Sequence, residues 1–136
     1  MGNNEALNRQ PLDRILYAED DLDIQVLVSL ALTMISNFTL NVCNSGLEAV
    51  NEVEAFDPQL LLLDVMMPFL DGPGALKQIR EMEAFKEIPV VFLTAKVQGP
   101  EVEAYLKMPG VAVISKLFDP MTLAGQITEF WANLDN

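Results

Sequence analysis

Three carboxylates, one hydroxyl and one ammonium group stand at or just beyond the ends of short apolar runs in this sequence. They belong to Glu19, Asp20, Asp64, Thr94 and Lys116. Carboxylates that are packed together repel each other, so such a set calls for a bound cation or for raised pKa values. Mg²⁺ takes octahedral oxygen ligands and keeps several waters, so two carboxylates and one backbone carbonyl would suffice to hold it.

A carboxylate beside such an ion can attack phosphorus and carry the phosphoryl group as an aspartyl-phosphate. Asp64 is the best candidate for this nucleophile. Phosphoryl transfer depends on positioning and charge neutralisation more than on acid–base chemistry. Mg²⁺ held by Glu19 and Asp20 would neutralise one phosphoryl oxygen. Lys116 would pair with a second oxygen, and the Thr94 hydroxyl could donate a hydrogen bond to a third.

The apolar runs are predicted strands, and they alternate with segments whose apolar residues recur at helical spacing. This alternation predicts an α/β fold, in which a parallel sheet carries helices on both faces as a doubly wound sandwich. We expect strands at 14–18, 38–43, 60–63, 89–93 and 111–114, and helices at about 22–35, 45–55, 74–82, 100–108 and 120–133.

The candidate residues follow the first, third, fourth and fifth predicted strands. Ligands of open parallel sheets bind outside the carboxyl ends of the strands, so these side chains should share one rim of the sheet. Each residue taken alone has a plainer interpretation as a turn residue, a helix cap or a solvated charge. Four strand ends that agree make coincidence a poor explanation for the whole set.

Local signals place several further residues. Asn44 or Ser45 can cap the second helix, and Glu48 completes a capping box with Ser45. Cys43 is the only cysteine and lies in an apolar strand pattern, so we expect a buried structural thiol. The first helix should bury a broad apolar face made of Ile24, Leu27, Val28, Ala31 and Ile35.

Composition bounds the classes of function. The net charge is −12, from 20 acidic and 8 basic residues, and such a surface repels nucleic acid and anionic lipid. No apolar run approaches the ~20 residues that span a bilayer, and the polar start lacks a signal-peptide core, so we expect a cytoplasmic chain. The absence of histidine excludes His-based catalytic triads and His-ligated metals. One domain is expected over 13–134, preceded by a mobile tail over 1–12.

Four blocks of the sequence resemble the receiver domains of response regulators in two-component signalling, the CheY-like domains. The blocks are 15–21, 62–68 with 71–72, 91–96 and 115–120. One such block is a weak signal, but four in this order and at the family's own spacing are specific. The resemblance covers residues 14–131. It implies a flavodoxin-like (βα)5 sandwich whose five-stranded parallel sheet has the order 2-1-3-4-5.

The resemblance also implies a role for each candidate residue. Asp64 would be the phospho-acceptor, Thr94 the switch hydroxyl and Lys116 the lysine that pairs with the phosphoryl group. The Mg²⁺ ligands would be Glu19, Asp20, Asp64 and the backbone carbonyl of Met66. The phosphoryl donor would be a histidine kinase or a histidine phosphotransfer protein. A domain that modifies only itself in this way is not expected to be an enzyme with separate substrate turnover.

Two positions depart from the family's pattern. Leu117 follows Lys116 where the family usually has a proline, often after a cis bond, so the direction of the lysine side chain is open. Val113 stands where the family often has an aromatic switch residue, a role that Tyr105 or Phe118 would have to take.

In the family, partners bind the face made of the fourth helix, the fifth strand and the fifth helix, and a dimer could form there too. Residues of that face here are Tyr105, Met108, Val113, Phe118 and Met121, which fit a core as well as an interface. The output partner stays unknown. A pseudo-receiver that binds partners without phosphorylation is the main alternative. A phosphatase resembling the haloacid dehalogenases is opposed by Met66, because those enzymes have a second aspartate at that position.

Overall fold

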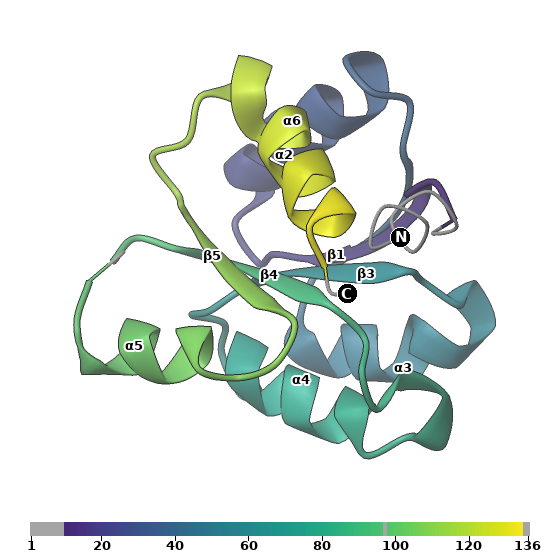
Figure 1. The fold of residues 1–136 in the computed structure, drawn as a ribbon, viewed down its shortest axis with the longest axis vertical. Coiled ribbons are helices and arrows are strands. Elements are labelled where there is room, and N and C mark those ends of the chain that lie inside the picture. The colour runs from purple at the N-terminus through teal and green to yellow at the C-terminus, as the bar shows by residue number, and fades with distance from the viewer. Residues whose placement is uncertain (1–9, 97, 135–136) are drawn as a thin grey trace, which may run out of the picture.

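The sheet has five parallel strands in the order β2-β1-β3-β4-β5, which confirms the predicted fold (Figure 1). The protein is described by a computed structural model over residues 10–96 and 98–134. The strands are β1 (Arg14–Ala18), β2 (Thr39–Cys43), β3 (Leu60–Asp64), β4 (Val90–Thr94) and β5 (Val111–Ser115). The helices are α2 (Leu22–Met34), α3 (Gly46–Phe56), α4 (Gly72–Arg80), α5 (Pro100–Leu106) and α6 (Pro120–Ala132), with a short 3₁₀ helix η1 (Glu83–Phe85).

Helices cover both faces of the sheet and bury two apolar cores. Helices α2 and α6 lie side by side on one face, and α3, α4 and α5 lie on the other (Figure 1). Alternate residues of β1 serve the two cores, with Ile15 and Tyr17 on the α2 side and Leu16 and Ala18 on the α3 side. The central strands β3 and β4 are buried throughout, as expected for a parallel sheet covered on both faces.

Side-chain caps start most of the helices. The Ser45 hydroxyl accepts from the backbone N–H of Glu48 at 3.0 Å, as the capping box predicts. The Glu48 carboxylate accepts instead from the N–H of Asn44, one residue before the cap, at 2.9 Å. Asp71 caps α4 by accepting from the N–H of Gly74 at 2.8 Å, so this helix begins two residues earlier than predicted.

The buried face of α2 differs from the prediction. Val28 and Ala31 are buried as expected, together with Leu32, whereas Leu27 and Ile35 are exposed. The helix is apolar nearly all round, so helical spacing alone did not define which side packs on the sheet.

Residues at the start of the described chain contact the domain. Backbone carbonyls of Gln10 and Pro11 accept from the Trp131 indole N–H at 2.9 Å and from the Gln59 amide at 3.0 Å. The predicted mobile tail over 1–12 otherwise falls on residues 1–9, outside the described residues. Within the described ranges, the helices are too short or too polar to cross a bilayer.

Candidate functional site

The three acidic side chains meet at the carboxyl ends of β1 and β3, as predicted. Carboxylate oxygens of Glu19, Asp20 and Asp64 lie within 4.8 Å of one another. Glu19 directly follows β1 and is fully buried, and Asp64 ends β3 and is 1% exposed. Asp20, one residue further along the loop, is exposed. The group therefore has a buried floor of two carboxylates and a third carboxylate open to solvent.

Lys116 reaches both buried carboxylates from beyond the end of β5. Its Nζ lies 3.2 Å from Asp64 Oδ1 and 3.3 Å from Glu19 Oε2. The described residues contain no cis peptide bond, so the bond to Leu117 is trans. The Leu117 side chain points outward, 91% exposed. The lysine thus reaches the acidic group without the family's proline, which settles the direction left open by the sequence.

Two buried carboxylate oxygens at the site make no hydrogen bond to any described residue. They are Glu19 Oε1 and Asp64 Oδ2. Buried polar atoms nearly always have a partner, and an uncompensated one costs on the order of 1–3 kcal/mol. Two such oxygens beside an exposed aspartate form a hard, anionic donor set with open lone pairs. That donor set fits Mg²⁺, and it offers no soft ligand for zinc or copper.

Burial and charge at the site raise the pKa values of one acidic and one basic group, Glu19 and Lys116. Burial and the neighbouring Asp64 carboxylate raise the pKa of Glu19 to about 7, although Lys116 and the N–H of Asp21 oppose that rise. Partial burial alone would lower the pKa of Lys116, but Asp64 and Glu19 outweigh it and raise that pKa above its usual value. The lysine is therefore firmly charged, while Glu19 is near its titration point at neutral pH.

The loop after β3 holds Asp64 by close backbone packing. The N–H of Met66 donates to Asp64 Oδ1 at 3.3 Å, and the Met66 side chain is exposed. A Cβ atom on Gly72 would lie 2.4 Å from the carbonyl oxygen of Asp64, so only glycine fits there. The N–H of Gly72 donates to the carbonyl of Val65 at 3.0 Å. The glycine of the 71–72 block thus closes the loop onto the end of β3.

Thr94 lies at the end of β4, on the same rim. It is buried, and its hydroxyl accepts from the N–H of Lys96 at 3.1 Å. Its carbonyl accepts from the N–H of Lys116 at 2.8 Å, which ties the start of the lysine loop to β4. In the register of the sheet Thr94 pairs with Ser115, and Asp64 with Leu93. The hydroxyl therefore belongs to the strand next to the candidate nucleophile.

Two residues near the site carry signals that sequence reasoning missed. Tyr17 is fully buried, and its hydroxyl has no hydrogen-bond partner among the described residues. Burial and the charges of Glu19, Asp64 and Asp21 raise the pKa of this phenol. The Gln25 amide donates to the Glu19 carbonyl at 2.6 Å and to Asn44 Oδ1 at 2.7 Å, which joins the loops after β1 and β2. Both residues look unremarkable within an apolar run and a helix pattern.

Four of the five residues named for the predicted output face are partly buried and pack against the cores. Tyr105 is half-buried, and its ring centroid lies 5.1 Å from that of Phe92. Met108 and Val113 pack against the α3-side core, and Phe118 packs against the α2-side core. Of the five residues named for this face, only Met121 is strongly exposed.

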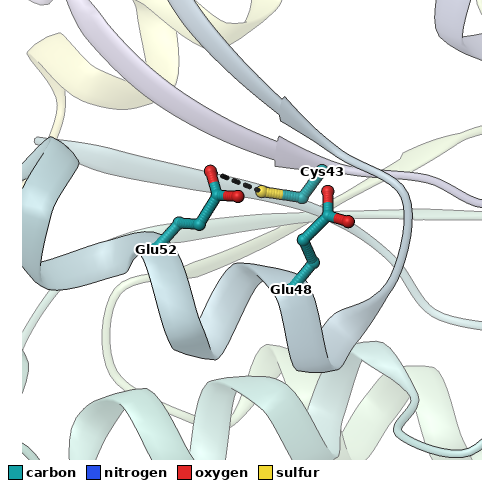
Figure 2. Close-up of side chains that lie close together, drawn as sticks. All are labelled: Cys43, Glu48 and Glu52. Carbon is teal, nitrogen blue, oxygen red and sulfur yellow. Dashed lines mark hydrogen bonds between the residues drawn. The ribbon is translucent and has the colours of Figure 1, made fainter.

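A second group of potential metal ligands lies between the end of β2 and helix α3. Cys43 is buried at the end of β2 and faces Glu48 and Glu52 of α3, as Figure 2 shows. Burial and the two glutamates raise the pKa of the thiol to about 12, so the thiol keeps its proton. It donates to Glu52 Oε1 across 3.9 Å (Figure 2). This chemistry fits the predicted buried structural thiol, because metal ligation requires a thiolate.

Comparison with known proteins identifies the family of the chain. The family profile of the response regulator receiver domain matches residues 15–128. Response regulator Rre1 of Synechocystis sp. is 32% identical over 78% of this chain and 46% of its own length. The CpxR homolog of Haemophilus influenzae is 35% identical over 70% of this chain and 39% of its own length. The chain therefore spans less than half the length of these curated relatives.

Solved structures agree in fold. The chemotaxis response regulator CheY4 of Vibrio cholerae superposes with a TM-score of 0.79 at 21% identity, covering 88% of this chain and 98% of that one. The receiver domain of sensor histidine kinase PA1611 of Pseudomonas aeruginosa, which holds a magnesium ion in its active site cleft, gives 0.77 at 26% identity, covering 88% and 97%. A CheX–CheY complex of Borrelia burgdorferi with BeF3 and magnesium gives 0.74 at 21% identity, covering 86% and 87%.

Fold and site thus define an α/β signalling module of the CheY-like type. The chain belongs to the response regulator receiver domain family of two-component systems.

Proposed function

We propose that this receiver domain accepts a phosphoryl group on Asp64. The observation that carries the proposal is the position of Lys116, whose ammonium lies 3.2 Å from Asp64 Oδ1 and 3.3 Å from Glu19 Oε2. A cation fixed beside one aspartate, with two further carboxylates facing that aspartate, is the arrangement that phosphoryl transfer to a carboxylate requires.

The residues present would hold Mg²⁺ through Glu19, Asp20, Asp64 and the backbone carbonyl of Met66. Bound there, the ion supplies charge neutralisation for the phosphoryl oxygens. The two unpartnered buried oxygens of Glu19 and Asp64 support this assignment. The magnesium ion in the receiver domain of PA1611 supports it by analogy.

The protein's own groups account for the transfer step. A carboxylate oxygen of Asp64 forms a bond to phosphorus while the phosphorus–nitrogen bond of a phosphohistidine breaks. The imidazole of the donor keeps the electron pair and is protonated by solvent. Lys116 then pairs with a phosphoryl oxygen in place of the Asp64 oxygen, and the Thr94 hydroxyl donates to another. The donor is a histidine kinase or a histidine phosphotransfer protein, and an output partner reads the change.

Beryllofluoride, which mimics a phosphoryl group on aspartate, tests the proposal in solution. With Mg²⁺ it should perturb backbone amide resonances of the loops after β1, β3, β4 and β5 in the full chain. Asp64→Asn should abolish that response, whereas Asp57→Asn, at an exposed carboxylate far from the rim, should retain it. A wild-type spectrum that does not change with millimolar Mg²⁺ and beryllofluoride would instead favour the pseudo-receiver, which binds partners without phosphorylation.

A further inference from the structure

Three buried side-chain atoms of the described residues have no hydrogen-bond partner there, and all three belong to the same end of the sheet. They are the Tyr17 hydroxyl, Glu19 Oε1 and Asp64 Oδ2. Over residues 10–96 and 98–134, every other buried side-chain nitrogen or oxygen has a partner. Buried polar groups nearly always hydrogen-bond to protein or to ordered water. Since the three exceptions occur together, one partner that they share is the simplest explanation.

Strand geometry places the Tyr17 side chain beneath the acidic group. Side chains alternate between the two faces of a strand, so Tyr17 and Glu19 lie on the same face, the α2 side. The backbone ladder continues to Glu19, whose N–H donates to the carbonyl of Cys43 at 3.0 Å. On the neighbouring strand Tyr17 pairs with Leu62, two residues before Asp64. The phenol therefore belongs to the row of side chains directly below both buried carboxylates.

The Tyr17 hydroxyl is a hydrogen-bond donor in otherwise apolar surroundings. The same row continues across β3, β4 and β5 with the apolar side chains of Leu62, Val91 and Ala112. Burial and the charges of Glu19, Asp64 and Asp21 raise the pKa of the phenol, so it keeps its proton. A protonated hydroxyl near ionised carboxylates directs that proton toward them, and a carboxylate can only accept. The hydroxyl and the two free oxygens are therefore complementary.

We propose that Tyr17 is a positioning residue of the acidic group, acting through one buried water. The Tyr17 hydroxyl donates to the water, and the two protons of the water go to Glu19 Oε1 and Asp64 Oδ2. Buried waters make about three hydrogen bonds, which is the number that these atoms supply. The bridge fixes the orientation of both carboxylates.

The bridge has a consequence for metal binding, and this part of the inference rests on the proposed function. Glu19 and Asp64 would be ligands of Mg²⁺, so a group that orients their carboxylates also tunes the affinity for the ion. Loss of an outer hydrogen-bond partner of metal ligands typically lowers metal affinity by about 10- to 100-fold. Tyr17 should therefore affect Mg²⁺ binding without contacting the ion.

Urea unfolding of the full chain in EDTA at pH 8 tests the bridge without metal. Tyr17→Phe keeps the ring and removes the hydroxyl, so the urea concentration at the midpoint of unfolding should fall. A hydroxyl that has no partner would give the opposite sign, because removing an unsatisfied buried polar group stabilises the fold. Tyr105→Phe is the matched control at the other of the two tyrosines, which packs on the α3 side of the sheet, and its midpoint should not fall.

Calorimetric titration with Mg²⁺ measures the second consequence. Tyr17→Phe should bind the ion at least about tenfold more weakly than the wild type, and Tyr105→Phe should bind it equally well. Addition of Mg²⁺ should also shift the near-ultraviolet absorption of tyrosine in the wild type and in Tyr105→Phe but not in Tyr17→Phe. A residue that only packs in the core would produce neither difference.

A high-resolution crystal structure of the wild-type chain tests the bridge directly. It should show one water within about 3.1 Å of the Tyr17 hydroxyl and of the free oxygens of Glu19 and Asp64. A hydroxyl without that water overturns the inference, as does a midpoint in Tyr17→Phe that stays the same or rises. Equal Mg²⁺ affinities in Tyr17→Phe and Tyr105→Phe overturn the part that concerns metal. A wild-type chain that does not bind Mg²⁺ contradicts the proposed function instead, because the water and the unfolding in EDTA still decide the bridge.

Discussion

The buried Glu19 carboxylate should make the metal-free protein less stable as the pH rises. Its pKa is raised from 4.5 to about 7 in the folded chain. The folded state therefore binds more protons than the unfolded state between these values, and the free energy of unfolding falls as the pH rises through this window. Each unit of pKa difference corresponds to about 1.4 kcal/mol, so ionised Glu19 costs roughly 3 kcal/mol above pH 7.

Urea unfolding in EDTA, followed by circular dichroism from pH 5 to pH 8, measures this cost. Glu19→Gln keeps the shape of the side chain and removes its titration, so it should be more stable than wild type at pH 8 by up to the same roughly 3 kcal/mol. The two proteins should converge toward pH 5. Saturating Mg²⁺ at pH 8 should recover much of the difference in the wild type alone. A loss of stability in Glu19→Gln at pH 8 would contradict the cost assigned to ionised Glu19. So would a free energy of unfolding that depends on pH in the same way in Glu19→Gln and in the exposed control Glu103→Gln.

Three further substitutions test the packing and charge around the site, each read as a free energy of unfolding. Lys116→Met leaves two buried carboxylates without their cation and should lower the free energy of unfolding by about 2 kcal/mol at pH 8 without metal. The control Lys86→Met removes an exposed ion pair with Glu83 and should lower it by under about 0.5 kcal/mol. Gly72→Ala forces a Cβ to within 2.4 Å of a β3 carbonyl and should cost more than about 2 kcal/mol, whereas Gly125→Ala, which meets open space in α6, should stabilise by about 0.5–1 kcal/mol. Ser45→Ala removes the cap of α3 and should cost about 1 kcal/mol. For Lys116 and Gly72, a loss equal to that of the control would contradict the assigned contact, and for Ser45 an unchanged free energy of unfolding in Ser45→Ala would do so.

The sequence was sufficient for the fold and for the membership of the acidic group. Strand runs such as 60–63 are short, apolar and bounded by turn residues, so the sequence alone predicts where these strands begin and end. The carboxyl ends of parallel strands meet by topology, and that rule alone places Glu19 and Asp64 together. The roles of these residues, by contrast, are proposals that rest on chemistry.

Sequence patterns could not predict the features that depend on tertiary packing. The side of α2 that packs on the sheet was misassigned at Leu27 and Ile35, because an apolar residue at almost every position leaves the helical period without contrast. The close approach of Gly72 to the Asp64 carbonyl depends on how the loop after β3 folds back. The direction of Lys116 depends on a loop in which Leu117 stands where the family usually has proline, and only the structure shows that the lysine side chain reaches the carboxylates.

The most direct test of the central claim is to locate the phosphoryl group itself. The full chain is incubated with Mg²⁺ and a small-molecule phosphodonor such as acetyl phosphate, reduced with borohydride to trap the acyl phosphate, and mapped by peptide mass spectrometry. We predict one modified residue, Asp64, with modification lost in Asp64→Asn and when Mg²⁺ is removed. Modification at Asp20 or Glu19 instead, or an unmodified chain under conditions that label a known receiver domain, would contradict the account.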